Sequence, residues 1–445
     1  MASTYLNRAF SSGSVGTIAT WSFWIKRSLI GSAQFIFQTR DANSNNYRTY
    51  FRFGSTDTFD MFAYNSSGTQ ILDLRTNRVF RDTSAWYHIV IAMNTTISAT
   101  PSDRIKFYVN GVQETSFGTA TYPTHNLDIR KVSSVYTGWG QNIPNNSSFV
   151  DGSMSHINFI DGTAYDATAF GSTDSTTGEW VITTNPSVTY GTNGYFILKD
   201  GNTITDSSPN SNNFSLGGGT LTKTEDNPSN VFATWNPLQA TTSASYDFSA
   251  GNTRMAVNDV TAFSLGATLA ATTGKYYMEM KWVQQGGNGS WGMIPIDTDI
   301  SNRPRNAGVG WNQGDNAPWL LGTIVSGSWG GSIGTNDIIQ LAMDLDNGAF
   351  YFGKNDVWLN SGDPTSGASK TGAVDFSGTS LFGKQLTFAI GKGASGTDGW
   401  NANFGNGYFE QTAVTSAGTP GSTPGTFEYD VPSGYQPLST KGLNA

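Results

Sequence analysis

Residues 86–113 constrain the fold of this chain more than any other stretch. Residues 86–93 are apolar at nearly every position, which is typical of a strand that is covered on both faces. Apolar and polar side chains alternate over residues 105–110, the period of a half-buried strand. Asn110-Gly111 then predicts a type I′ hairpin turn, because both residue types tolerate a positive φ. We therefore expect antiparallel strands joined by tight turns.

Composition supports an all-β protein with more than one domain. The 445 residues include 52 glycines, 13% aromatic residues and only 13% charged residues, a balance that fits rigid β-domains with many turns. The sequence shows no helical periodicity and no heptad run, so neither a helical domain nor a coiled-coil shaft is expected. The length allows two or three domains.

The first third of the chain carries a family resemblance. A Trp-x-His-Ile strand at residues 86–89 is followed by a strand that ends in Tyr-x-Asn-Gly at residues 108–111. This pair resembles the laminin-G-like branch of the concanavalin A-like lectin/glucanase fold, and the resemblance extends to the strand predicted at residues 150–162. It implies a two-sheet antiparallel jelly roll, which we expect over residues 1–171. That fold hosts lectins, glycosidases, adhesins and purely structural modules.

The composition changes after residue 171. Over residues 172–240 Ser, Thr, Asp and Asn dominate, and we expect a connector with short strands. Its segments 190–198, 206–214 and 226–230 resemble a connector between lectin-like and SPRY-like modules in structural proteins of bacteriophages, particularly marine phages such as cyanophages. We expect a second β-sandwich over residues 241–445, and the order of strand-like runs over most of residues 274–438 resembles a SPRY-like domain. The expected architecture is therefore all-β: two antiparallel β-sandwiches, lectin-like and then SPRY-like, joined by a β-rich connector.

Charge and cysteine content exclude several functions. The net charge of −8 with only 25 Lys and Arg argues against nucleic-acid binding and against a polybasic membrane patch. The chain has no cysteine, which excludes disulfides, thiol catalysis and cysteine-ligated zinc. Residues 1–10 lack the basic and apolar regions of a signal peptide, and no apolar run is long enough to span a bilayer. We expect synthesis in a host cytoplasm, release by lysis and a place in the virion.

The sequence predicts a protein that is not an enzyme. A glucanase of the lectin fold needs two carboxylates on one strand as nucleophile and general acid, and the six glutamates show no such pairing. Glu279 stands between Met278 and Met280, and we expect its side chain on a solvated strand face. His88 is expected to lie inside the sandwich rather than to act as a general base.

No cofactor is expected apart from a structural calcium ion. The family resemblance implies that such domains sometimes hold calcium at a rim of loop aspartates and backbone carbonyls. Asp41, Asp57 and Asp151 are the candidates, and the sequence does not choose among them.

Carbohydrate binding needs aromatic faces for pyranose rings and polar groups for the hydroxyls. Trp139, Trp319 and Trp329 lie in glycine-rich surroundings near Asn, Gln or Asp, and Asn142 follows Trp139 closely. These four are the candidate glycan-binding residues. The alternative is that the three rings close the ends of the sandwiches.

The resemblance implies a bacteriophage virion surface protein. The first hypothesis is an adhesin, a receptor-binding component of the tail or a tail fibre that recognises glycans on the host cell. The alternative is a capsid decoration or knob protein without a soluble ligand, and a polysaccharide depolymerase has the least support. Expected partners are other virion proteins of the capsid or tail, host surface polysaccharide, and further copies of the chain, for example in a trimer. Nucleic acid and membrane insertion are not expected.

Overall fold

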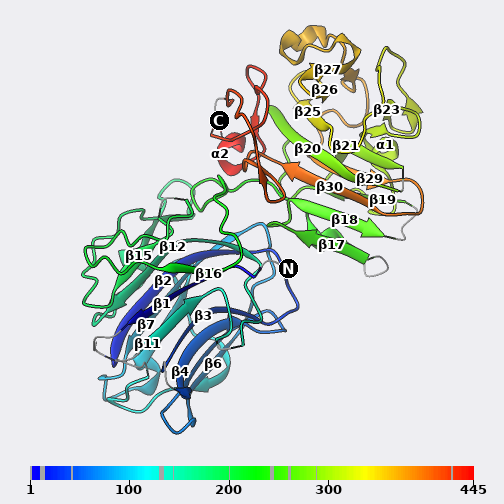
Figure 1. Ribbon diagram of the computed structural model, residues 1–445. Helices are drawn as coiled ribbons and strands as arrows, with labels where there is room; N and C mark the ends of the chain where they lie inside the picture. Colours follow the sequence, from blue (N-terminus) through cyan, green and yellow to red (C-terminus); the bar gives the residue numbers. More distant parts are fainter. Residues whose placement is uncertain are drawn as a thin grey trace. The chain divides into compact units, whose positions relative to one another are not determined.

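The computed structural model divides the chain into two compact units, Met1–Lys223 (unit 1) and Thr224–Ala445 (unit 2) (Figure 1). It describes residues 3–10, 16–41, 44–129, 135–143, 145–199, 201–240, 245–258, 262–286, 288–421 and 424–444. Strands dominate both units, and the helices in these ranges are short turns of three to six residues. The expected all-β fold class is confirmed. None of the helices in the described ranges combines the length and the apolar character that crossing a membrane requires.

Unit 1 is an antiparallel β-sandwich. Its described strands are β1 (Tyr5–Phe10), β2 (Ile18–Arg27), β3 (Gln34–Asp41), β4 (Ser44–Phe53), β5 (Thr58–Tyr64), β6 (Gln70–Val79), β7 (Trp86–Asn94), β8 (Ile105–Val109), β9 (Val112–Glu114), β10 (Phe117–Thr121), β11 (Val135–Trp139), β12 (Gly152–Asp161), β13 (Gly171–Thr173), β14 (Trp180–Ile182), β15 (Tyr195–Ile197) and β16 (Ser215–Gly218), with 3-10 turns η1 (Pro101–Arg104) and η2 (Ala167–Ala169). One sheet has the order β10-β6-β5-β4-β3-β11-β1-β16, and the other β15-β12-β2-β7-β8-β9. We call them the eight-stranded and the six-stranded sheet.

The stretch at residues 86–113 forms the centre of the six-stranded sheet. β7 pairs antiparallel with both β2 and β8. Ile89 and Ile91 face the core between the sheets, while Val90 is buried on the opposite face. Asn110 and Gly111 adopt φ values of 47° and 79° and turn the chain from β8 into β9. The doubly covered strand and the hairpin turn are both confirmed.

The outer face of the six-stranded sheet is covered by the chain that follows β12. Phe170, Tyr190 and Phe196 pack there against Val90 and Ile160. Pairing of β13 with β14 adds a small two-stranded sheet in this covering segment.

His88 lies within this covered face and is fully buried. Its Nδ1 accepts a hydrogen bond from Trp180 Nε1 at 2.9 Å, and its Nε2 lies 2.9 Å from Ser22 Oγ. Trp24 stacks on its ring at 4.7 Å. Burial lowers the pKa of His88 to about 3, so the ring stays neutral. The expectation of an interior histidine is confirmed.

Residues 172–223, expected to be part of the connector, contribute strands to unit 1. β15 pairs with β12 at one edge of the six-stranded sheet, and β16 pairs with β1 at one edge of the eight-stranded sheet. These strands extend both sheets of the sandwich, because each satisfies the backbone groups of an edge. The division into three domains at residues 171 and 240 stays a prediction, and residue 241 lies outside the described residues.

Unit 2 is a second β-sandwich. Its described strands are β17 (Ser245–Ser249), β18 (Arg254–Asn258), β19 (Phe263–Gly266), β20 (Lys275–Gln285), β21 (Gly289–Pro295), β22 (Val309–Asn312), β23 (Ala317–Leu320), β24 (Thr323–Ile324), β25 (Ile338–Asp344), β26 (Ala349–Lys354), β27 (Val357–Trp358), β28 (Val374–Asp375), β29 (Leu386–Lys392), β30 (Asp398–Asn403), β31 (Tyr408–Phe409), β32 (Thr412–Ala413) and β33 (Gln436–Pro437). The helical turns are η3 (Pro237–Gln239), α1 (Pro304–Ala307), η4 (Leu359–Ser361), η5 (Pro364–Ser369) and α2 (Thr440–Leu443). One sheet follows the path β17-β18-β30-β20-β25-β26-β27 and the other β19-β29-β21-β22-β23-β24.

The two sheets of unit 2 enclose a core rich in tryptophan. Trp291 and Trp311 stack with ring centroids 6.4 Å apart, and Trp282 lies 5.5 Å from Trp291. Among the described strands of unit 2, every pairing is antiparallel except that of β33 with β20. Two antiparallel β-sandwiches, as expected from the sequence, are therefore confirmed.

Candidate functional site

The hairpin of β22 and β23 places Trp319 at the surface of unit 2. Trp311 on β22 points into the core, whereas Trp319 lies opposite Gly310 and is only partly buried. Side chains of directly paired residues share one face of a sheet, so Trp319 lies on the outer face. Short α1 packs on the same face, because a side chain at Gly310 would meet the backbone of Arg305. The sequence thus sets an aromatic ring beside a short helical turn.

Asp315, in the loop of this hairpin, joins the polar groups around the ring. Its Oδ2 accepts a hydrogen bond from Trp319 Nε1 at 3.0 Å and another from Asn312 Nδ2. The same oxygen lies 3.5 Å from Arg305 Nη1. The Asp315 side chain is 37% exposed, so the carboxylate faces solvent beside the indole.

Arg305 lies over the Trp319 ring, with its guanidinium carbon 4.6 Å from the ring centroid. This cation–π contact and the Asp315 hydrogen bond hold the indole from two directions. A ring that is held in place loses little rotamer freedom when a ligand binds to it. We call Asn312, Asp315, Trp319 and Arg305 the Trp319 cluster.

Exposed apolar side chains extend the surface next to Trp319. Ile324 on β24 pairs with Trp319 in register and is 51% exposed, and Leu321 in the intervening turn is 38% exposed. The outer face therefore combines the polar groups around Asp315 with the exposed apolar side chains of Leu321 and Ile324. Small-ligand sites use this combination for affinity and orientation.

Trp139 and Trp329 are not surface residues. Trp139 is 1% exposed, packs on Phe37 at 4.8 Å and donates a hydrogen bond to Tyr195 Oη at 2.9 Å. Trp329 is 4% exposed, and its Nε1 donates to the Val325 carbonyl at 3.1 Å. Neither ring offers a face to a sugar, so the prediction that they bind glycans is corrected. Both rings belong to the hydrophobic core of their unit.

Asn142 is partly buried and pairs through its backbone with Ser147, where the Asn142 N–H donates to the Ser147 carbonyl at 2.9 Å. With Trp139 buried, Asn142 has lost the aromatic partner that made it a candidate. Its role in glycan binding stays a prediction.

Asp57 is held by two arginines and a backbone N–H. Its Oδ1 pairs with Arg27 Nη2 at 3.1 Å and accepts the Gly31 N–H at 2.7 Å, and its Oδ2 pairs with Arg81 Nε at 3.0 Å. Burial works against ionisation, but the hydrogen bonds and the two arginines hold the pKa of Asp57 below its ordinary value. A carboxylate already neutralised by two arginines has little affinity left for a cation.

Asp41 and Asp151 stay predictions as calcium ligands. Asp41 ends β3, and Asp151 directly precedes β12, at the start of the strand that pairs with β2. Across the described ranges, no three His, Cys, Asp or Glu side chains come together in a way that could hold a metal ion. The structure thus provides no carboxylate cluster around either residue in its described part.

Glu279 is buried, and the expectation of a solvated carboxylate is wrong. Its Oε1 accepts hydrogen bonds from Tyr277 Oη and from the Tyr429 N–H, both at 2.9 Å, and its Oε2 accepts the Glu428 N–H at 2.8 Å. Burial raises the pKa of Glu279 to about 7, and these donors offset only part of that effect. The carboxylate is 0% exposed, so it fastens the C-terminal segment to β20 and does not face a substrate.

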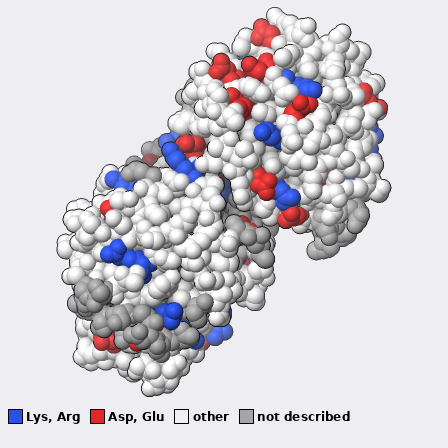
Figure 2. Space-filling view, viewed as in Figure 1, with Lys and Arg blue, Asp and Glu red and all other residues white. Residues whose placement is uncertain are grey.

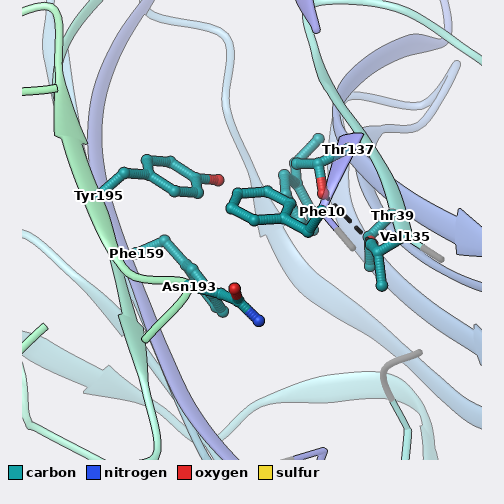
Figure 3. A pocket seen from close by; sticks show the side chains of 8 residues that line it. Phe10, Thr39, Val135, Thr137, Phe159, Asn193 and Tyr195 are labelled. Atoms are coloured by element: carbon teal, nitrogen blue, oxygen red, sulfur yellow. Dashed lines mark hydrogen bonds between the residues drawn. The ribbon is translucent and has the colours of Figure 1, made fainter. Parts of the chain in front are cut away.

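A small cavity lies between the sheets of unit 1, and Figure 3 shows the side chains that line it. They are Phe10, Phe37, Thr39, Val135, Thr137, Phe159, Asn193 and Tyr195. Its volume is about 10 Å³, the space of about one water molecule. The cavity is therefore too small for a sugar ring, and the surface around Trp319 is the better candidate.

The family comparison concerns unit 1. Residues 4–170 match the Laminin_G_3 model, the concanavalin A-like lectin/glucanases superfamily. This match runs from β1 to η2 and covers less than half of the chain. It confirms the resemblance expected from residues 86–111 and 150–162. No protein with curated annotation matches the sequence.

Several solved structures show some likeness to parts of this chain. The SPRY domain of human HERC1 is 13% identical, with a TM-score of 0.29 over 38% of this chain and 96% of that one. The heptameric SAP-like pentraxin from Limulus polyphemus is 16% identical, with a TM-score of 0.28 over 36% and 71%. The carbohydrate-binding module CBM66 from Bacillus subtilis is 11% identical, with a TM-score of 0.26 over 38% and 92%.

Proposed function

We propose that this chain is a carbohydrate-binding protein and that the Trp319 cluster is a sugar site. The observation that carries this proposal is the partly exposed Trp319 ring, held by Arg305 and hydrogen-bonded to a solvent-facing Asp315. The C–H face of a pyranose packs on an indole, while its hydroxyls donate to a carboxylate in charge-assisted hydrogen bonds.

The lectin-like match of residues 4–170 supports the same class of function for the protein as a whole. A fold by itself does not determine function, so the match supports the proposal without locating the site. The proposed role is binding rather than catalysis, because Asp315 is an acceptor in a surface network and Glu279 is enclosed in the interior.

The biological setting of this binding is a finer part of the proposal. The resemblance of residues 190–198, 206–214 and 226–230 to connectors of bacteriophage structural proteins supports a place in a virion. There the protein would act as an adhesin on the tail or a fibre, bound to other virion proteins and assembled with further copies of itself. The host ligand would be a surface polysaccharide.

The experiment that tests the sugar site is a glycan array followed by titration calorimetry with the best oligosaccharide. Trp319→Ala is expected to weaken binding by at least about tenfold, since buried aromatic anchors contribute about 2 kcal/mol or more to binding. Trp319→Phe keeps a stacking ring but loses the hydrogen bond to Asp315, so an intermediate affinity is expected.

Phe382→Ala is the matched control, because Phe382 is an aromatic residue of the same unit that is 46% exposed. It should bind like the unmodified protein. Equal affinity of Trp319→Ala and Phe382→Ala would exclude the Trp319 cluster as the site. An array without any bound glycan would contradict carbohydrate binding as a whole.

A further inference from the structure

The outer face of the eight-stranded sheet carries an array of arginines and aromatic rings. In one row across four strands, Tyr136 pairs with Arg40, Arg40 with Arg48, and Arg48 with Tyr64. Paired residues share one face of a sheet. The intervening residues of β4 and β5, such as Phe51 and Met61, belong to the core, so this row points outward.

Two further rows continue the array along the strands. Tyr50 pairs with Phe62 in the second row, and Arg52, Asp60 and Arg75 follow one another in the third. Side chains two residues apart on a strand lie roughly 7 Å apart, so Arg48 and Arg52 are separated by roughly 13 Å. We call Arg40, Arg48, Arg52 and Arg75, with the rings beneath them, the arginine face.

Each guanidinium of the arginine face lies over an aromatic ring. The distance from the guanidinium carbon to the ring centroid is 4.4 Å for Arg48 and Tyr64 and 5.6 Å for Arg40 and Tyr136. Phe62 has two arginines over it, Arg52 and Arg75, each at 5.1 Å, and is 3% exposed. The rings orient the guanidinium groups, which form the outer layer of the surface.

The array has more positive than negative charge. Asp73 lies opposite Phe62 in the second row. Asp60 and Asp73 are the only acidic residues of these rows: Asp60 pairs with Arg52 Nε at 3.0 Å, and Asp73 pairs with Arg75 Nε at 2.9 Å. Unit 1 as a whole is balanced, with 15 Lys and Arg against 15 Asp and Glu, whereas unit 2 has 10 against 18. Figure 2 shows basic groups on the visible face of unit 1 and mainly acidic groups on that of unit 2. Four arginines on one sheet face are therefore a local concentration of positive charge in an acidic protein.

We propose that the arginine face binds an anionic polysaccharide, one that carries carboxylate or sulfate groups along its chain. Planar guanidinium groups match both anions through paired N–H donors. The ion pair of Arg52 with Asp60 uses Nε, so the terminal Nη groups of Arg52 lie outside it. The proposal does not depend on the Trp319 cluster, which lies in unit 2.

The test is binding of the full chain to immobilised polygalacturonate and dextran sulfate, with neutral dextran as reference. We expect binding to one or both anionic polymers and none to dextran, and a fall in affinity as NaCl is raised from about 0.05 M to about 0.5 M. Preference between the two polymers identifies the anion as carboxylate or sulfate. Arg48→Gln and Arg52→Gln are each expected to lower affinity by about tenfold.

Arg78→Gln is the matched control. Arg78 lies on β6 three residues after Arg75, but it is outside the paired rows of the arginine face, and its 47% exposed side chain pairs with Glu114 on β9. It changes the net charge equally and should leave affinity near that of the unmodified protein. Arg48→Lys retains the charge without the planar fork and should give an intermediate affinity, which separates recognition from any loss of folding. Trp319→Ala should bind both polymers normally.

Three results would overturn the proposal. These are equal binding to dextran and the anionic polymers, unchanged affinity in Arg48→Gln and Arg52→Gln, and an equal loss in Arg78→Gln. A fourth contradicting result would come from light scattering. If the protein forms a larger assembly that dissociates in Arg48→Gln, the arginine face is a contact between copies of the chain.

Discussion

The buried carboxyl group of Glu279 should make the stability of unit 2 depend on pH. The variant Glu279→Gln tests this dependence. The pKa of Glu279 is raised from 4.5 to about 7, mainly by burial. The native state therefore binds this proton more tightly than the unfolded chain does. The resulting stabilisation is fully present below about pH 4.5 and is lost as the pH rises through 7. At about 1.4 kcal/mol per pKa unit, it amounts to about 3 kcal/mol.

Glu279→Gln removes this titration and also places an NH2 group where the carboxylate accepts N–H donors. The Glu428 and Tyr429 N–H groups each donate to a different oxygen, so either amide orientation opposes one donor. At pH 5 the variant is expected to be less stable than the unmodified protein, because a buried donor loses its acceptor. The difference from the unmodified protein should shrink by up to about 3 kcal/mol between pH 5 and pH 8.

The assay is urea unfolding followed by tryptophan fluorescence at several pH values, with separate transitions fitted for the two units. Glu179→Gln, at an exposed position of unit 1, is the control and should leave the unit 2 transition unchanged. The difference in the free energy of unfolding between the two proteins could instead stay constant with pH or grow as the pH rises. Either result would contradict a raised pKa of Glu279 in the native state. Growth would mean that the N–H donors outweigh burial and that the carboxylate is ionised in the native state.

Three further predictions concern unit 1 and are measured by the free energy of unfolding. Phe107→Ala removes a fully buried ring and should destabilise by about 3–5 kcal/mol; a near-neutral result would contradict the placement of β8 in the core. Gly111→Ala should cost about 1–3 kcal/mol, since φ is 79° and a Cβ there would meet the Trp180 ring; a smaller loss in Gly111→Ala,Trp180→Ala than the two single losses together would attribute part of the cost to that contact. Asp57→Asn leaves Arg27, 1% exposed, without its counter-charge and should cost about 3–5 kcal/mol; a loss below about 1 kcal/mol would show that the buried pair is unimportant.

Local signals in the sequence were sufficient for strands and tight turns. Residues 86–113 encode their own periodicity and turn, and the structure has them as β7, β8 and the turn at Asn110 and Gly111. Residues 337–352 work in the same way and form β25 and β26 around Gly348 at φ 71°. These elements depend on residues close in sequence, which is why a single sequence predicts them.

Burial of individual polar and aromatic residues could not be predicted in the same way. Trp139 and Trp319 both lie in glycine-rich surroundings, yet Trp139 is buried because Tyr195, 56 positions away, accepts its hydrogen bond. Glu279 is buried because Glu428 and Tyr429, 149 and 150 positions away, provide donors. Partners at such distances are set by the sheet order.

The Trp319 cluster and the arginine face differ in how far they can be predicted from the sequence. Asp315 precedes Trp319 by four positions in a predictable loop, so their proximity could have been inferred. Alternation over residues 48–52 and 60–64 is also visible, but the pairing of Arg40 with Arg48 depends on the register of β3 with β4.

The most direct test of carbohydrate binding is a crystal structure of the protein with its best oligosaccharide from the glycan array. We expect a sugar ring stacked on Trp319, with a hydroxyl within hydrogen-bond distance of an Asp315 oxygen. A sugar bound elsewhere, with the Trp319 ring still free, would contradict it.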